Sequence, residues 1–144
     1  MLRLSVAVFT VAFGADLLTK EWAVSQNVGA LLFNDIASQF PLRILFCGVA
    51  VAVAVALGRF AGSRGLGRQW GLWIGAALLV AGVLANGVSS FLWARGVPDF
   101  IDVEGGWVWN LADFEIAIGM TGGILSVGVS AVATYARGLR AQAR

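Results

Sequence analysis

Residues 111–135 read LADFEIAIGMTGGILSVGVSAVATY, and the two carboxyl side chains of this run, Asp113 and Glu115, lie near its start. A helix of about 20 predominantly apolar residues is long enough to cross a bilayer. Three further apolar stretches approach the same length, at residues 2–18, 42–57 and 70–92. The sequence therefore predicts an all-α integral membrane protein, built as a bundle of four transmembrane helices.

The composition also indicates a membrane protein. Of the 144 residues, 59% are hydrophobic and 12% are charged, and the mean hydropathy is +0.84. A soluble domain is usually about 45–50% apolar and about 25% charged. We therefore expect one membrane domain over residues 1–144. The first stretch can also be read as a signal peptide, because Arg3 near its start precedes an apolar run that ends in small residues. We favour a span because the run continues into the charged segment 16–20.

The positions of Arg and Lys predict which side of the membrane each end faces, because positive residues concentrate in cytoplasmic loops. One side of the predicted bundle carries most of them, namely Arg3, Arg59, Arg64, Arg68, Arg137, Arg140 and Arg144. The other side carries Lys20, Arg43 and Arg95, together with all of the acidic residues. Both termini are therefore expected in the cytoplasm, with every carboxylate at or beyond the outer interface.

The residue inventory excludes several kinds of chemistry. The chain has no histidine and a single cysteine, Cys47. Nucleophiles activated by histidine are therefore excluded, as are an internal disulfide and a histidine or cysteine metal site. The net charge of +2 is too small to indicate nucleic-acid binding. A hydrolase built on this sequence would use Asp, Glu, Lys, Ser or Thr, and we expect no metal and no cofactor.

Two aspartates at the edges of apolar spans are the strongest candidate site residues. Asp113 stands three residues after Asn110, an arrangement typical of a helix N-cap, and Asp99 follows Pro98 in the segment that leaves the third stretch. A structural role would explain either acid alone. Two carboxylates that share a site, however, cannot both ionise easily. One can take a proton from water while the other donates one, so the pair favours aspartyl hydrolysis of a peptide bond.

Other polar residues are placed to support this pair. Asp16 and Lys20 are four residues apart at the predicted outer end of the first span, where they could pair and extend toward water. Asn86 lies deeper, where an amide usually joins helices. Asn27 lies in a predicted turn and could cap the helix or bind substrate backbone. Arg95 could anchor the third span at the interface.

Five short motifs, in order along the chain, resemble those of the lipoprotein signal peptidases, the signal peptidase II family. They are Asp16-x-x-Thr19-Lys20, Asn27-x-Gly29-Ala30, Gly82 with Asn86, Val97-Pro98-Asp99-Phe100, and Trp109-Asn110-Leu111-Ala112-Asp113 continued by Ile116 and Gly119. Each motif is short. Their order and their predicted depth in the membrane nevertheless agree with the family along most of the chain.

The resemblance implies a four-helix aspartic peptidase of the bacterial inner membrane, with its active site at the outer face. Such enzymes bind lipidated prolipoproteins and cut before the diacylglyceryl-modified cysteine. Asp99 and Asp113 take the positions of the catalytic dyad. Supporting or substrate-binding roles are implied for Asp16, Lys20, Asn27, Gly29, Asn86 and Asn110. We expect the prolipoprotein signal peptide and membrane lipid as partners, no nucleic acid, and a monomer.

Three departures from the family pattern indicate a divergent or minimal member. Ser89 and Ser90 stand where the family has an Asp-Arg pair that shapes the site, and Arg95 could supply the missing cation from nearby. Pro98 replaces an apolar β-branched residue and should stiffen the approach to the first aspartate. The segment after the first span is short, so the small β-cradle that the family forms over the membrane should be reduced.

Two other classes of function are kept open. A catalytically inactive relative could act as a membrane scaffold or a lipoprotein-binding module, which the Ser89-Ser90 replacement favours and the retention of both aspartates opposes. A small transporter or channel subunit would need polar residues through the bilayer centre, and the spans hold few apart from Asn86 and some hydroxyls. Cleavage of a lipidated prolipoprotein is the observation that separates these classes.

Overall fold

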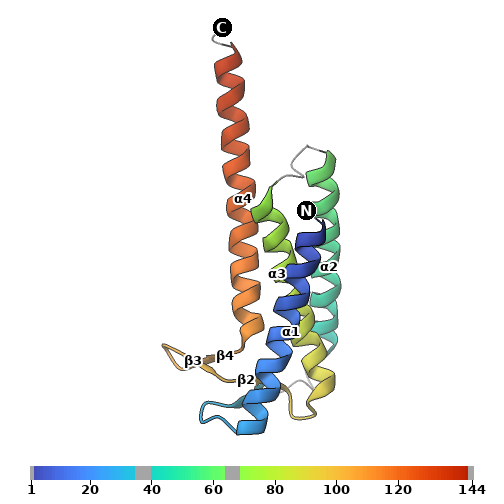
Figure 1. The fold of residues 1–144 in the computed structure, drawn as a ribbon, viewed down its shortest axis with the longest axis vertical. Coiled ribbons are helices and arrows are strands. Elements are labelled where there is room, and N and C mark those ends of the chain that lie inside the picture. The colour runs from blue at the N-terminus through green and yellow to red at the C-terminus, as the bar shows by residue number, and fades with distance from the viewer. Residues whose placement is uncertain (1, 35–39, 64–68, 143–144) are drawn as a thin grey trace.

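A computed structural model describes residues 2–34, 40–63 and 69–142, and it consists mainly of four helices (Figure 1). These helices are α1 (Leu2–Gln26), α2 (Phe40–Ser63), α3 (Trp70–Leu92) and α4 (Leu111–Gln142). The bounds of α3 agree with the predicted 70–92, whereas the other three helices extend beyond their predicted spans. Hydropathy marks only the part of a helix that suits lipid, and the hydrogen-bonded helix continues past it.

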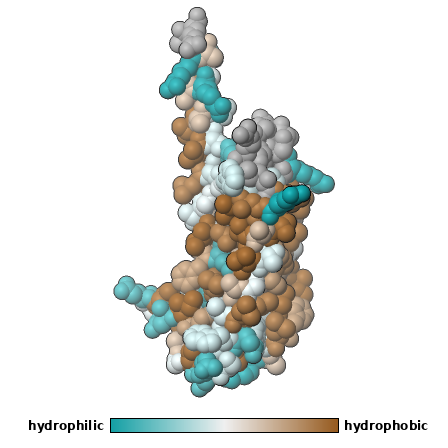
Figure 2. All heavy atoms as spheres, in the orientation of Figure 1, coloured by the Kyte–Doolittle hydropathy of each residue, from teal (hydrophilic) through white to brown (hydrophobic). Residues whose placement is uncertain are grey.

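Three of the helices, α1, α3 and α4, are long and apolar enough to cross a membrane. Within the described part of α2, the apolar segment Cys47–Ala56 is shorter. The structure therefore supports a helical membrane protein, and the fourth span stays a prediction. Figure 2 shows hydrophobic side chains along the middle of the molecule and hydrophilic ones toward its two ends, the pattern expected of a surface that faces lipid.

Helix α3 is the centre of the bundle and packs against α1, α2 and α4, most extensively against α4. Glycine allows the close approach of α3 to α4. A Cβ atom on Gly75 would lie 2.8 Å from the carbonyl oxygen of Gly119, and one on Gly119 would lie 2.5 Å from the backbone nitrogen of Leu79. Any side chain at either position would push the two backbones apart.

Four short strands lie at one end of the bundle, between the helices (Figure 1). Strand β1 (Leu32–Asn34) pairs antiparallel with β2 (Val97–Asp99), and β3 (Ile101–Val103) pairs antiparallel with β4 (Trp107–Trp109). Each strand has only three residues. This small segment agrees with the expectation of a reduced β-cradle.

The pairing of β1 with β2 depends on Gly96. Its φ of 124° is in the left-handed region, and a Cβ atom there would lie 2.2 Å from the carbonyl oxygen of Asn34. Only glycine satisfies both constraints. The close approach at Gly96 aligns Asn34 with Val97 and Leu32 with Asp99, which brings β1 beside the first candidate aspartate.

The start of α1 and the end of α4 both lie away from the strands (Figure 1). The two ends of the chain are therefore on the same side of the bundle, opposite the segment that holds β1 to β4. The cytoplasmic location of that side remains a prediction from the arginine distribution.

Candidate active site

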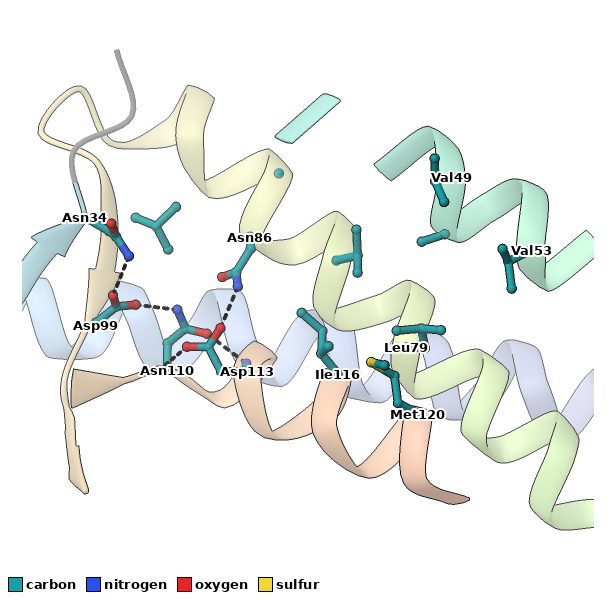
Figure 3. A pocket seen from close by; sticks show the side chains of 14 residues that line it. Asn34, Val49, Val53, Leu79, Asn86, Asp99, Asn110, Asp113, Ile116 and Met120 are labelled. Atoms are coloured by element: carbon teal, nitrogen blue, oxygen red, sulfur yellow. Dashed lines mark hydrogen bonds between the residues drawn. The ribbon is translucent and has the colours of Figure 1, made fainter. Parts of the chain in front are cut away.

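Asp99 and Asp113 come from different elements and meet around a single asparagine (Figure 3). Asp99 ends β2, and Asp113 lies in the first turn of α4. The side-chain nitrogen of Asn110 donates to Asp99 Oδ1 at 2.5 Å, and its backbone nitrogen donates to Asp113 Oδ2 at 3.0 Å. Asn110 is 1% exposed. One buried residue thus connects the two acids.

The same asparagine begins α4. Asn110 Oδ1 accepts the backbone N–H of Asp113 at 3.2 Å, while Asp113 Oδ2 accepts the backbone N–H of Asn110. This reciprocal pair is a capping box with aspartate in the place usually taken by glutamate. The predicted N-cap is confirmed. Because the cap fixes both side chains, Asp113 is oriented by the start of its own helix.

Asn34 is a member of the site that the sequence did not reveal. Its side-chain nitrogen donates to Asp99 Oδ2 at 3.2 Å, so both oxygens of Asp99 accept hydrogen bonds from amides. The only local signal was one polar residue after an apolar run, which is common at a strand end. Its role depends on the β1–β2 pairing, which the sequence alone did not predict.

Asn86 of α3 approaches Asp113 from the other side. Its side-chain nitrogen donates to Asp113 Oδ1 at 3.0 Å, and its side-chain oxygen accepts from Lys20 Nζ at 2.7 Å. The expectation that this amide joins helices is confirmed, since it bonds residues of α1 and α4. It also links the candidate site to the buried pair on α1.

The pair formed by Asp16 and Lys20 is fully buried, with Lys20 Nζ 2.7 Å from Asp16 Oδ2. The prediction that these side chains extend toward water is wrong. Helix α1 continues beyond them to Gln26, and neighbouring elements supply their remaining partners. Asp16 Oδ1 accepts the backbone N–H of Ala112 at 2.8 Å, and Lys20 also donates to Ser89 Oγ at 3.1 Å. A buried ion pair is tolerated when such hydrogen bonds complete it.

The acids lie at the polar end of a cavity of about 590 Å³ (Figure 3). Asn34 and Asn86 share this end with Asp99, Asn110 and Asp113. The remainder of the wall is mainly apolar and comes from α2, α3 and α4, including Val49, Val53, Leu79, Ile116 and Met120. The cavity can therefore hold an apolar chain with a polar group placed beside the acids.

Burial raises the pKa of Asp99 above the usual value for an aspartate. The hydrogen bond from Asn110 opposes this change, the negative charge of Asp113 adds to it, and the hydrogen bond from Asn34 and the charge of Lys20 also oppose it. The net direction is upward. Asp99 therefore keeps a proton at a pH where an exposed aspartate would be ionised.

Three residues predicted to support the site lie outside this cavity. Asn27 is exposed, has a φ of 49° and ends α1, which is a conformation that asparagine accepts at a helix C-terminus. Gly29 is also exposed. The guanidinium carbon of Arg95 lies 4.3 Å from the centroid of the Phe33 ring, a cation–π contact. The cation that bonds Ser89 is Lys20. The hypothesis that Arg95 supplies the missing cation from nearby stays a prediction.

Fold and site together define a helical membrane protein with two aspartates held around one buried asparagine. Comparison with known protein families then identifies the family to which the chain belongs. The model of the signal peptidase (SPase) II family matches residues 22–129, and the chain belongs to this family. The family consists of aspartic peptidases that process lipoprotein signal peptides, so the predicted resemblance is confirmed.

Solved structures support the same fold. Two, each described as a bacterial membrane enzyme determined by the in meso method, at 2.3 Å and 1.9 Å resolution, are similar to this chain with a TM-score of 0.62 and 18% identity. The similarity covers 88% of this chain in both cases, and 88% and 94% of the two other chains. At this identity the likeness shows the fold alone. No curated protein matches the sequence closely enough to count as a relative.

Proposed function

We propose that this protein is a membrane-embedded aspartic endopeptidase that removes signal peptides from bacterial prolipoproteins, cutting before the diacylglyceryl-modified cysteine. The observation that carries the proposal is the link between Asp99 and Asp113 through Asn110 at the polar end of an apolar cavity. Membership of the signal peptidase II family gives the substrate class.

The reaction needs one ionised acid and one neutral acid. The ionised carboxylate takes a proton from a water molecule whose oxygen attacks the scissile carbonyl carbon, and the neutral acid gives its proton to the carbonyl oxygen. The resulting tetrahedral diol collapses when a proton passes to the amide nitrogen and the C–N bond breaks. The protons are then redistributed between the acids, so the dyad returns to its starting state.

The cavity suggests how the substrate lies. The apolar part of the signal peptide occupies the wall formed by α2, α3 and α4, while the scissile bond lies between the two aspartates. The acyl chains of the modified cysteine stay in the surrounding lipid. Asn34, Asn86 and Asn110 orient the acids or the peptide backbone. Asn27, Gly29 and Arg95 support the site from the end of α1 and from the surface beside β1 and β2.

The proposed topology has four spans in a single domain, with both termini in the cytoplasm and the site at the outer face of the inner membrane. The strands and the acids lie at one end of the bundle, and the ends of the chain lie at the other (Figure 1). One chain holds both acids, the three asparagines that bond them and the whole described cavity. A monomer is therefore sufficient for catalysis.

The decisive experiment compares cleavage of lipidated and unlipidated prolipoprotein by purified protein. We expect the wild type to cut the lipidated form, and Asp99→Asn or Asp113→Asn to lower the rate by at least about 10³-fold, since each removes a proton-transfer group. Asp102→Asn is the matched control, because Asp102 is exposed on the neighbouring strand β3 and should leave cleavage unchanged. Wild-type rates in either dyad variant would refute the assignment.

A second candidate function is that of an inactive relative that binds lipoproteins, favoured by serine at positions 89 and 90. The structure weakens this alternative, because Ser89 completes the hydrogen bonding of Lys20 and Ser90 Oγ donates to the carbonyl oxygen of Gly87 at 2.6 Å. An inactive binder would retain lipidated prolipoprotein on the purified wild type and release no shorter product.

A further inference from the structure

Lys20 is fully buried, and each hydrogen of its ammonium group has an acceptor. Its Nζ atom lies 2.7 Å from Asp16 Oδ2, 2.7 Å from Asn86 Oδ1 and 3.1 Å from Ser89 Oγ. The hydroxyl hydrogen of Ser89 goes to the carbonyl oxygen of Ala85 at 2.6 Å, so Ser89 Oγ accepts from Lys20. An ammonium group has three donors and no acceptor, which agrees with this arrangement.

This ammonium group fixes the orientation of the Asn86 amide. The side-chain oxygen of Asn86 must face Lys20, so its nitrogen faces Asp113 and donates to Oδ1 at 3.0 Å. The reversed amide would direct N–H toward an ammonium group and a carbonyl oxygen toward a carboxylate, two repulsive contacts in a partly buried site. Lys20 therefore determines that Asn86 offers a donor to Asp113.

Both oxygens of Asp113 consequently face N–H groups, which donate hydrogen bonds and cannot accept one from a proton on Asp113. Oδ1 faces the oriented amide nitrogen of Asn86, and Oδ2 faces the backbone N–H of Asn110 at 3.0 Å. A proton on Asp113 would find no acceptor in either of these groups, and the neutral acid would accept both N–H hydrogen bonds less strongly than the carboxylate does. This environment is suited to a carboxylate and unsuited to the neutral acid.

Asp99 has a different environment. The amide of Asn110 is fixed, because its oxygen accepts the backbone N–H of Asp113 while its nitrogen donates to Asp99 Oδ1. Among the described residues, the side chain of Asn34, on the other side, bonds only Asp99 Oδ2. It can therefore turn its oxygen toward a proton on Oδ2. A proton on Asp99 Oδ2 therefore has an acceptor, the side-chain oxygen of Asn34, whereas a proton on Asp113 has none among these partners.

We propose that Lys20 is a positioning residue that acts through Asn86 to keep Asp113 as the carboxylate of the dyad, which leaves the shared proton on Asp99. The assignment rests on the proposed peptidase function and names the role of each acid. Asp113 takes the proton of the attacking water, and Asp99 gives its proton to the carbonyl oxygen of the scissile bond.

The net effect of the surroundings on Asp99 agrees with this assignment, although the charge of Lys20 alone favours the ionised form of Asp99. The charged groups that act on Asp99 from neighbouring helices are Asp113 of α4 and Lys20 of α1, whereas α3 and β1 contribute the uncharged Asn86 and Asn34. Helix α3 contains no charged residue at all. Burial and the charge of Asp113 both favour the neutral form of Asp99.

A double-mutant cycle tests whether Lys20 acts through Asn86. The variants are Lys20→Met, Asn86→Leu and the combination, each assayed for kcat and KM on lipidated prolipoprotein across pH. We expect each single change to lower kcat on the order of 10²-fold, with KM within about 2-fold of the wild type. The kcat of the double variant should lie no more than about 3-fold below that of Asn86→Leu alone, because Lys20 affects the rate only by orienting Asn86.

The pH profile gives a second readout that a merely structural role would not change. Loss of the Asn86 donor removes a hydrogen bond that favours the carboxylate form of the dyad, so the acidic limb of the kcat profile should move to higher pH in both single variants. Thr10→Val is the matched control on α1, since Thr10 is exposed and its hydroxyl donates to the carbonyl oxygen of Val6 within the same helix. It should leave rate and profile unchanged.

The role of Lys20 would be overturned if the losses in kcat of the two single variants multiplied in the combination. It would also be overturned if the acidic limb of the kcat profile stayed at the wild-type pH. If Lys20→Met does not accumulate in the membrane, the charge-neutral pair Asp16→Asn with Lys20→Met replaces it in the cycle, because it leaves no unpaired buried charge. A wild type that does not cleave would overturn the peptidase function and this inference together. A cleaving wild type with independent effects of the two residues would overturn this inference alone.

Discussion

Asp99 lies outside the helices, at the end of β2, and is 7% exposed. Its side chain is surrounded by two amides and by the second acid, whose charge reaches it through a buried, poorly screened environment. A carboxyl group in such surroundings is a proton donor at a pH where ordinary aspartates are not. At the scale of single residues, the chemistry of the site thus depends on the contrast between Asp99 and Asp113.

The rate of prolipoprotein cleavage should have a bell-shaped pH dependence. Burial raises the pKa of Asp99, and this acid acts in its neutral form, so activity should fall as the pH rises through that raised pKa. Activity should also fall at low pH, where the dyad as a pair gains a second proton and no carboxylate is left to accept one from water. Initial rates measured over roughly pH 4 to 9 check this expectation, and a flat profile would contradict it.

Glu115 offers a prediction about stability. It is 5% exposed, and its Oε2 atom has no hydrogen-bond partner among the described residues. A buried carboxyl oxygen without a partner is costly, and an amide of the same shape carries no charge. We expect Glu115→Gln to raise the unfolding temperature in detergent by about 2–4 °C. Glu104→Gln, at an exposed loop position, is the control and should have no effect; a lower unfolding temperature for Glu115→Gln would refute the argument.

At the scale of elements, the start of α4 combines a structural and a functional role in Asn110. Its side chain caps the helix through Asp113 and also reaches Asp99 on β2. The helix terminus and the dyad are therefore held by the same hydrogen bonds. The sequence of the first turn fixes the position of one acid and, through Asn110, its relation to the other.

Substitutions at Asn110 can separate these two roles. Serine is as good an N-cap as asparagine, but its side chain is too short to bond both the helix and Asp99. Asn110→Ser should therefore keep stability within about 0.5 kcal/mol while cleavage falls at least about 10-fold. Asn110→Ala should lose both activity and about 0.5–2 kcal/mol of stability. Thermal unfolding and rate measurements on the two variants decide this; equal activity of Asn110→Ser and wild type would contradict it.

The contact between α3 and α4 gives a second prediction at this scale. Gly119→Ala places a methyl group 2.5 Å from backbone of α3, so the helices must separate, and we expect a loss of about 1–3 kcal/mol. Gly122→Ala, on the same helix, meets nothing within 4 Å and should not destabilise the protein. Unfolding in detergent should rank the two variants clearly. Equal stability would mean that the close approach is not required.

For the whole molecule, the two ends of the bundle differ in content. The strands lie at one end of the bundle, and the start of α1 and the end of α4 lie away from them (Figure 1). Asp99 ends β2 and Asp113 lies in the first turn of α4, so the two aspartates and the polar end of the cavity lie beside the strands. Arg137 and Arg140 lie near the C-terminal end of α4, on the side away from the strands. This separation is what a peptidase needs if it acts on substrates that have reached the outer face.

Cysteine labelling tests this orientation. In a background with Cys47→Ala, which removes the single native cysteine, we expect Glu104→Cys to react with a membrane-impermeant maleimide in intact cells. Arg140→Cys should react only after the membrane is permeabilised, because arginine-rich segments stay in the cytoplasm. The background protein without cysteine is the control. Labelling of Arg140→Cys from outside would reverse the proposed topology.

The sequence by itself determined that the chain forms apolar helices, where α3 begins and ends, that Asn110 caps α4, and that the chain belongs to the signal peptidase II family. These features depend on hydropathy over one segment, on residues three apart, or on short motifs. Each is a local property of the chain, so it can be recognised before the fold is known.

Only the tertiary structure decided which side chains surround the acids. Asn34 and Asp99 are 65 residues apart, and Asp16 bonds a backbone group 96 residues away. Whether a lysine extends to water or is buried depends on the acceptors that neighbouring helices supply, so spacing within α1 could not settle it for Lys20. Long-range partners are chosen by packing, which the pattern of a single segment does not contain.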